Sequence, residues 1–220
     1  MNKKLKIALL LIFALAGFVQ AQQRPENVAI GDIFCSNGDI LMPDEYTAAG
    51  RTDGIGVVFY VDGTGQHGWI TYKGQSAALK WTTASFHSTG VHVYTSVREE
   101  GNDANSVIKD LDGAGNTDEI KNETGQYEYS TANYPACGYA VDLGEGWYLP
   151  AAGQLNFMYA YIPVLNDSLE KIGGTLFGAD WYLWSSDESS HDYAWFLKYD
   201  GSCNKSRKDQ TGRVRAVRDF

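Results

Sequence analysis

The sequence contains few cysteines and few histidines, and neither type is arranged as a metal site. Three cysteines, Cys35, Cys137 and Cys203, allow at most one internal disulfide, and none belongs to a CxxC pair. The sequence cannot choose which two would pair. The four histidines are scattered, without the helical spacing of paired zinc ligands. No residue beside a cysteine indicates an activated thiol, so we expect no metal, no cofactor and no cysteine catalysis.

Basic charge is also scarce. The 27 acidic residues outnumber the 18 lysines and arginines, which gives a net charge of -9, and removal of the first 21 residues would leave -12. This excess argues against nucleic acid or an anionic membrane as a partner, because both bind clustered Lys and Arg. The one basic stretch lies in the last 23 residues and comprises Lys198, Lys205, Arg207, Lys208, Arg213, Arg215 and Arg218.

Long apolar runs are absent beyond the amino terminus, where an export signal is indicated. Three lysines precede an apolar run over residues 7–19, and Val-Gln-Ala at 19–21 supplies small residues for a signal peptidase. The run is shorter than the roughly 20 residues that span a bilayer. We therefore expect residues 1–21 to be a signal peptide and the exported protein to be periplasmic, cell-surface or secreted, without membrane insertion after cleavage. An uncleaved anchor is the alternative.

The remaining residues 22–220 have the length of one domain, with two small domains as the alternative. Short strands and glycine-rich turns stand at both ends and helices in the middle, which indicates an α+β fold. Residues 54–63 and 68–72 are expected to form a hairpin. Residues 73–105 show no sustained periodicity and are expected to be mainly loops.

A helix is expected to start at Asn116, which can cap the first turn while Glu119 reaches back three residues. The run that begins at Asp110 looks like a calcium loop but fails the pattern, since Lys121 stands where an EF-hand requires a bidentate glutamate. We interpret it as a turn that precedes the helix.

A second helix is expected after Pro150. Four apolar residues there recur at i, i+3, i+4 and i+7 and share one face: Leu155, Met158, Tyr159 and Ile162. Residues 194–199 and 213–218 alternate in the manner of strands, and Arg213 and Arg215 are expected to face away from the core.

Tryptophans flank these elements, and Trp147, Trp181 and Trp195 are expected to be mostly buried. The stretch from Tyr182 to Tyr193 is rich in polar residues and is expected to be a loop that presents the ligand surface. The residues expected to bind the ligand are Tyr182, Trp184, Ser185, Ser186, Asp187, Glu188, His191 and Asp192, together with Lys205 and Lys208 of the basic stretch, which would favour acidic ligands.

A series of landmarks carries a resemblance to a known family. They are Trp147-Tyr148-Leu149-Pro150, Trp184-Ser185-Ser186, Ala194-Trp195-Phe196 and Val214-Arg215-Ala216-Val217-Arg218. In this order they resemble the Lcl C-terminal domain family, within the C-type lectin-like group. The resemblance implies a single C-type lectin-like domain over 22–220, with a small, twisted, mostly antiparallel sheet, two flanking helices and long loops. It also implies that the two ends of the domain pair as neighbouring strands.

The chain departs from this family at two points. Many members carry a cysteine in the final strand, where Ala216 stands here, so Cys137 is expected to be a buried thiol and Cys35 with Cys203 becomes the leading candidate pair. The triplets with which calcium-dependent animal lectins hold calcium and sugar are absent from the sequence. We therefore expect no calcium-dependent sugar binding.

The function indicated is a secreted or cell-surface recognition and adhesion module that binds an extracellular glycan or protein through its long loop. The alternative is an enzyme on the same fold type, such as a glycoside hydrolase that uses Asp187 with Glu188 or Asp192 as acid and base. Formylglycine-generating enzymes share the fold type but need reactive cysteines in an arrangement that this sequence does not match. We expect a binding protein rather than an enzyme.

Overall fold

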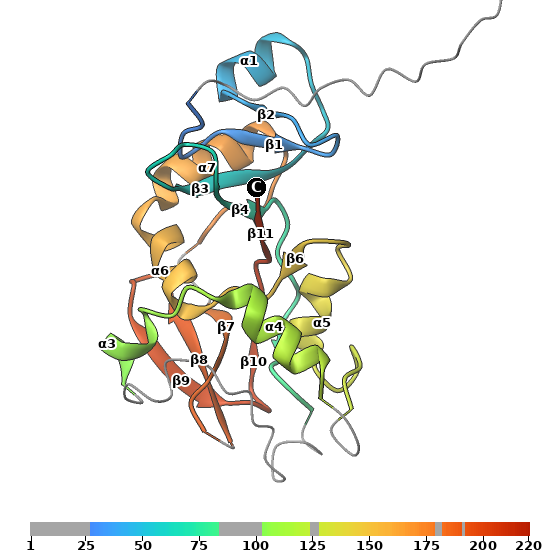
Figure 1. The fold of residues 1–220 in the computed structure, drawn as a ribbon, viewed down its shortest axis with the longest axis vertical. Helices are drawn as coiled ribbons and strands as arrows, with labels where there is room; N and C mark the ends of the chain where they lie inside the picture. The colour runs from blue at the N-terminus through green and yellow to red at the C-terminus, as the bar shows by residue number, and fades with distance from the viewer. Residues whose placement is uncertain (1–26, 84–102, 124–127, 179–181, 191) are drawn as a thin grey trace, which may run out of the picture.

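The computed structural model of the chain describes residues 27–83, 103–123, 128–178, 182–190 and 192–220. Over these residues the fold is α+β, as expected, with antiparallel sheets and short helices (Figure 1). The larger sheet lies toward one end of the molecule and a three-stranded sheet toward the other. None of the described helices has the length and hydropathy needed to cross a membrane.

The larger sheet joins the two ends of the described chain. Its six strands are β1 (Ile33–Cys35), β2 (Ile40–Leu41), β3 (Gly54–Val61), β4 (Gly68–Tyr72), β6 (Trp147–Tyr148) and β11 (Val217–Asp219). They follow the order β2-β1-β3-β4-β11-β6, and every neighbouring pair is antiparallel. The expected β3–β4 hairpin and the presence of both ends in one sheet are confirmed.

Two details of this sheet differ from the expectation. The final strand lies between β4 and β6, so β1 is not its neighbour and the expected direct pairing of the two ends is wrong. The strand expected over residues 213–218 is shorter and lies later in the sequence, as β11. Residues 213–216 precede it and are not part of a strand of the six-stranded sheet. Val214 and Ala216 are fully buried there.

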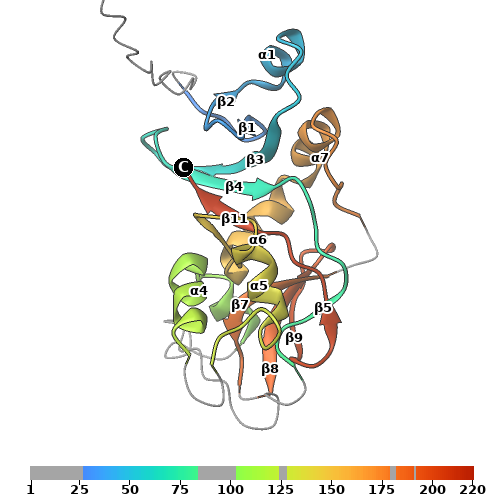
Figure 2. The ribbon, with the colours of Figure 1, turned by 90° about the vertical axis from the view of Figure 1, so that its right-hand side faces the viewer.

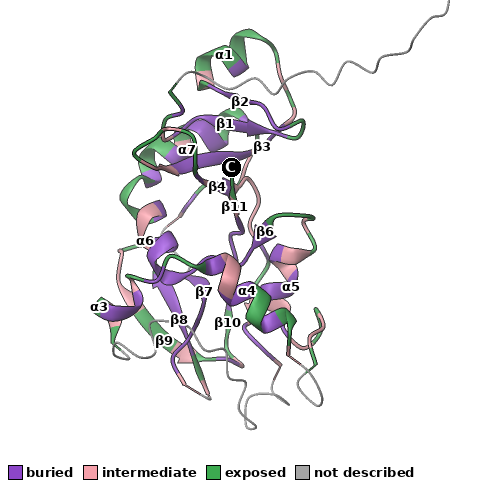
Figure 3. Ribbon diagram, viewed as in Figure 1, coloured by how far each residue is buried: buried purple, intermediate pink, exposed green. Residues whose placement is uncertain are grey.

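Between Tyr182 and Tyr193, where a long loop was expected, most residues belong to a strand of a smaller sheet. A three-stranded antiparallel sheet has the order β7 (Tyr182–Glu188), β8 (Tyr193–Lys198), β9 (Cys203–Arg207), and β5 (Leu79–Lys80) pairs with β10 (Thr211–Gly212). Six of the seven residues of β7 are buried (Figure 3). The expectation of a loop was wrong because the polar side chains of this strand are satisfied inside the protein rather than by water.

Six described helices complete the fold: α1 (Pro43–Ala48), α3 (Ala104–Val107), α4 (Gly113–Lys121), α5 (Pro135–Val141), α6 (Ala152–Ala160) and α7 (Ile162–Lys171). Helix α4 begins four residues before the expected position. Asp112 is its cap and accepts a hydrogen bond from the Gly115 amide at 2.8 Å. The expected cap, Asn116, lies inside the helix, and its side chain bonds to Asp110 and Ser186 instead.

The second expected helix is divided in two by Pro163, which falls in the first turn of α7, where its missing N–H costs little. Leu155, Met158 and Ile162 are buried as expected, whereas Tyr159 is 38% exposed. Figure 2 shows α6 and α7 beside the larger sheet. The face with Leu155 and Met158 is therefore core, as the periodicity predicted.

The core follows the alternation of the strands. In β3, Val57 and Phe59 pack with the α6–α7 cluster, while Val58 between them packs with the cluster that holds Trp147. Trp147 and Trp195 are only 7% and 5% exposed, which confirms their expected burial. Trp181 lies outside the described residues.

All three cysteines are free thiols. Cys35 belongs to the six-stranded sheet and Cys203 to the three-stranded sheet, so the expected Cys35–Cys203 disulfide is wrong. Cys137 is buried in α5, as expected, and burial raises its pKa to about 12.

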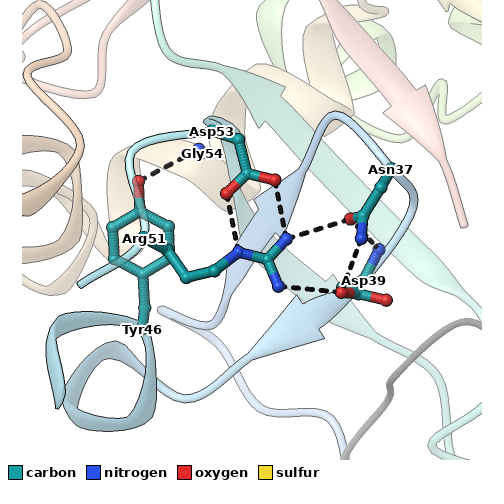
Figure 4. Close-up of polar contacts among 6 residues, drawn as sticks. All are labelled: Asn37, Asp39, Tyr46, Arg51, Asp53 and Gly54. Carbon is teal, nitrogen blue, oxygen red and sulfur yellow. Dashed lines mark hydrogen bonds and ion pairs between the residues drawn. The ribbon is translucent and has the colours of Figure 1, made fainter. Parts of the chain in front are cut away.

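A polar cluster fixes the turn between β1 and β2 to the start of β3 (Figure 4). The Arg51 guanidinium donates to both carboxylate oxygens of Asp53, at 2.8 and 2.6 Å, and to Asp39 at 2.9 Å. It also donates to Asn37 in the turn. The guanidinium therefore has a structural role, since both nearby carboxylates are bound to it.

Candidate functional site

Most of the residues predicted to contact a ligand are buried. Trp184, Ser185, Ser186 and Asp187 have no exposed surface, and Glu188 is 3% exposed. Their polar groups bind other parts of the chain: Trp184 Nε1 donates to the Leu79 carbonyl at 3.0 Å, and Ser185 Oγ donates to the Trp195 carbonyl at 3.0 Å. These side chains hold β7 in the interior and do not form a surface for a ligand.

Lys208 is also buried, contrary to the prediction that it is free to contact a partner. Its Nζ lies 2.5 Å from Glu188 Oε1, and both side chains are 0% exposed. The same nitrogen lies 4.8 Å from the centre of the Trp81 ring. Lys208 therefore balances the charge of Glu188 inside the protein.

The other predicted site residues do not gather into one surface. Tyr182 is half-buried, and its hydroxyl donates to the Thr211 carbonyl. Asp192 is half-buried, and Lys205 is exposed on β9 with its Nζ 5.6 Å from the Trp195 ring. His191 lies outside the described residues. A role of any of them in binding stays a prediction.

Two members of the basic stretch at the carboxyl end, Lys208 and Arg215, lie in the interior rather than on the surface. Arg215 was expected to face solvent but is fully buried, where it donates to the Thr175 carbonyl at 2.6 Å and to Gln75 Oε1 at 3.2 Å. Its guanidinium lies 4.2 Å from the Phe177 ring. Because it is buried among neutral groups, its pKa falls to about 9.

One groove on the described part of the protein combines aromatic and charged side chains. It lies between α4 and the paired strands β6 and β11 and has a volume of about 430 Å³. The residues that line it are Ala114, Thr117, Asp118, Lys121, Glu145, Gly146, Trp147, Tyr148, Arg218 and Asp219. Sequence reasoning placed Trp147 in the core and did not place Arg218 or Glu145 in a site.

Arg218 offers unused hydrogen-bond donors to this groove. Its guanidinium lies 5.3 Å from the Phe34 ring and donates to the Glu145 carbonyl at 3.4 Å, but it forms no ion pair within the described part of the chain. A guanidinium carries five N–H donors, so most of its donors remain available. The Glu145 side chain is exposed, and it too has no ion-pair partner among the described residues.

The other charged groups of the groove are held by neighbours. Lys121 Nζ lies 2.9 Å from Asp118 on the same helix. The Tyr148 hydroxyl donates to Asp219 at 2.7 Å and accepts from Gln154 at 3.0 Å. Burial, followed by the nearby Asp219 charge, raises the pKa of Tyr148, so its proton stays in place. These contacts fix the groove, while Arg218 and Glu145 retain free hydrogen-bonding capacity.

The arrangement suits the binding of a polar ligand. Positively charged donors and negatively charged acceptors line the groove together with Trp147. This combination matches a ligand with many hydroxyl or amide groups. Among the described residues that line the groove there is no histidine, serine or cysteine.

Comparison with known proteins gives a similarity of fold. No protein-family model and no curated protein sequence matches this chain. A fimbrial protein from Bacteroides ovatus ATCC 8483 has a similar structure, with a TM-score of 0.69 and 18% sequence identity, over 88% of this chain and 49% of that one. The chain thus corresponds to about half of the fimbrial chain. At this identity, what the two proteins share is the fold.

Proposed function

We propose that this protein is an exported recognition module of the cell surface that takes part in adhesion and binds its ligand in the groove between α4, β6 and β11. The apolar signal-like run at residues 7–19 supports export, and the fold shared with a fimbrial protein supports a surface location. We further propose that the domain is C-type lectin-like and related to the Lcl C-terminal domain family, since residues of the shared landmarks, such as Trp147 and Arg218, line this groove.

This proposal rests on two charged side chains of the groove, those of Arg218 and Glu145, which form no ion pair within the described part of the chain. Arg218 keeps free donors and Glu145 keeps free acceptors, both beside Trp147. A carbohydrate hydroxyl both donates and accepts, so a glycan can use the two side chains together, and a peptide main chain offers the same combination. The proposed partner is therefore an extracellular glycan or protein.

We propose binding without turnover. In the glycoside hydrolase alternative, Asp187 would act with Glu188 or Asp192. One oxygen of Asp187 accepts a hydrogen bond from the Ala152 amide at 2.7 Å, and Glu188 binds Lys208. A hydrolase needs both carboxyl groups beside its substrate, and the burial of these two supports the binding function.

The test is a binding screen of the mature chain, residues 22–220, on arrays of glycans and immobilised extracellular proteins. Arg218→Ala and Glu145→Gln should each weaken binding about tenfold or more, because a hydrogen bond to a charged group is worth about 1.5–3 kcal/mol. Lys205→Ala is the matched control, since Lys205 is exposed on β9 and does not line the groove. Hydrolysis of a bound glycan would favour the enzyme instead.

The same variants distinguish the groove from the surface predicted from the sequence. Should Tyr182→Ala and Lys205→Ala weaken binding while folded Arg218→Ala and Glu145→Gln bind as the wild type does, the ligand lies on the three-stranded sheet and the groove proposal is wrong.

A further inference from the structure

A buried pair of carboxyl groups lies behind the groove. Asp187 of β7 is fully enclosed, and its Oδ2 accepts a hydrogen bond at 2.7 Å from the amide of Ala152, the first residue of α6. Its Oδ1 is buried and meets no N–H or O–H donor in the described part of the chain. The nearby Ser185 hydroxyl, which lowers the pKa of Asp187, donates in the structure to the Trp195 carbonyl. Asp110 lies beside this part of β7, since Asn116 donates to both Asp110 and Ser186, and the Asp110 carboxyl group raises the pKa of Asp187.

Asp110 connects this pair to helix α4. It is 3% exposed, and its two oxygens accept hydrogen bonds from the Asp112 amide at 2.8 Å and from Asn116 Nδ2 at 3.1 Å. Asn116 also donates to Ser186 Oγ at 3.0 Å. The carboxyl pair therefore joins β7, the start of α6 and the first turns of α4.

Two ionised carboxylates enclosed side by side would repel each other, and neither has a proton to donate. A buried oxygen without a donor carries a further cost. We infer that Asp187 and Asp110 share one proton, donated by Asp187, and that this proton holds α4 in place as one wall of the groove. This rests on the proposed function only in what it implies for ligand binding.

Glu119 on α4 also has a raised pKa, so the Asp187 variants, rather than the pH profile alone, identify the group that responds to pH. Burial, followed by the charge of Asp110, raises the pKa of Asp187 and outweighs the Ala152 and Ser185 hydrogen bonds that lower it. Cys203 approaches from β9, and burial and the Asp187 charge raise its pKa to about 12, so it stays a neutral thiol. Helix α4 adds Asp112 and Glu119, whose charges oppose a further negative charge beside Asp110.

Strand β7 itself carries the adjacent Glu188, whose charge is paired with that of Lys208. Helix α6 has no acidic or basic side chain over Ala152–Ala160. Strand β8 contributes the neutral Trp195 carbonyl, which accepts a hydrogen bond from Ser185. Loss of the shared proton would place a new buried negative charge next to Asp110, and no cation of the described part of the chain is among the groups that set the pKa of Asp187.

This charge would act on the groove. Helix α4 supplies Ala114, Thr117, Asp118 and Lys121 to its lining. Because the folded pKa of Asp187 is raised above its ordinary 3.8, the folded state retains a proton that the unfolded state loses above that pH. The stability of this contact is greatest at acid pH and falls as the pH rises toward the folded pKa. The proton on Asp187 thus stabilises helix α4 as a wall of the groove, and this stabilisation decreases as the pH increases.

The experiment compares wild type with Asp187→Asn and Asp187→Ala by amide hydrogen exchange over residues 110–121, without ligand, from mildly acid to alkaline pH. The Asn side chain can donate to Asp110 and still accept from Ala152, so its protection of α4 should be high and independent of pH after correction for intrinsic exchange. Wild-type protection should fall with rising pH, by no more than about tenfold per pH unit because one proton is involved. Asp187→Ala should be poorly protected at every pH.

Identical pH profiles in wild type and Asp187→Asn, with α7 serving as the internal reference in each, would overturn the inference. Equal protection of α4 in the Asn and Ala variants would overturn it too, because the proton donated to Asp110 would then have no effect. Since no ligand is present, a failure to find any glycan or protein that binds the groove bears on the proposed function and not on this result.

Discussion

Arg218 of β11 lies directly opposite Trp147 of β6 in the six-stranded sheet. The two residues are far apart in the sequence, and the antiparallel pairing of these short strands brings them into one groove. The next pair along, Val217 with Tyr148, places the Tyr148 hydroxyl within 2.7 Å of Asp219. The register of two short strands therefore determines which side chains meet in the candidate site.

The first prediction concerns the tryptophan of β8. Trp195 is 5% exposed and packs with Val107 and Ala152. Trp195→Ala should lower the free energy of unfolding by about 3–5 kcal/mol, measured by denaturant unfolding, because it leaves a large cavity. Tyr193→Ala, in the same strand but 40% exposed, is the control and should change stability far less. Equal effects of the two substitutions would contradict the core position of Trp195.

The second prediction concerns Arg215, which is buried and has no carboxylate partner in the described part of the chain. Arg215→Met keeps most of the volume but leaves the Thr175 carbonyl and Gln75 without a donor, so it should cost about 1–3 kcal/mol of unfolding free energy. Arg213→Met, two residues away on an exposed side chain, should stay within about 0.5 kcal/mol of wild type. A stabilised Arg215→Met variant would mean that burial of the charge costs more than its hydrogen bonds return.

Local patterns in the sequence predicted the local parts of this fold. Two local features could be predicted from the sequence: the glycine-containing turn between β3 and β4, and the apolar face of Leu155, Met158 and Ile162. Each depends on residues that are close in sequence. The helix cap was misplaced because Asp112 and Asn116 are both good caps, and Asn116 has tertiary partners that only the fold reveals.

Long-range contacts account for the errors. The run Ser185-Ser186-Asp187-Glu188 looks like a loop because polar residues are usually solvated, yet it has hydrogen-bonding partners 10 to 104 residues away in the sequence. Arg215 likewise looks like the solvent side of a strand. The groove itself could not be predicted, since it depends on the pairing of β6 with β11, for which the sequence carries no local signal.

The third prediction concerns the thiols. The mature chain should contain three free thiols in denaturant, with an intact mass that shows no disulfide. In the native state Cys35 and Cys137 should react slowly with iodoacetamide, because both are buried and their pKa values are raised to about 11 and about 12. A mass lower by two hydrogens would indicate a disulfide and a different arrangement of β1 and β9.

The fourth prediction concerns the pH dependence of the Arg51 cluster. The hydrogen bond from Arg51 holds the pKa of Asp53 below its usual 3.8, so the pair stabilises the folded state above that pH, and the contribution is lost as the pH falls through the lowered pKa. Because both groups are partly exposed, Arg51→Ala should cost only about 1 kcal/mol or less at neutral pH. The difference from wild type should shrink at acid pH. Lys171→Ala, which removes a longer and more exposed pair with Asp44, should have no measurable effect.

The last prediction concerns the charge of the ligand. The groove is lined by two cations, Lys121 and Arg218, and three carboxylates, so it presents no cationic surface to a polyanion. Binding to a glycan should therefore change little between low and high salt, whereas a sulfated polymer held by several cations would lose affinity steeply as salt screens its charges. Neutral glycans should bind at least as well as acidic ones. A strong salt dependence that persists in Arg218→Ala would place the ligand on a different surface, and a strong dependence abolished by Arg218→Ala would mean that this one guanidinium recognises an anionic group.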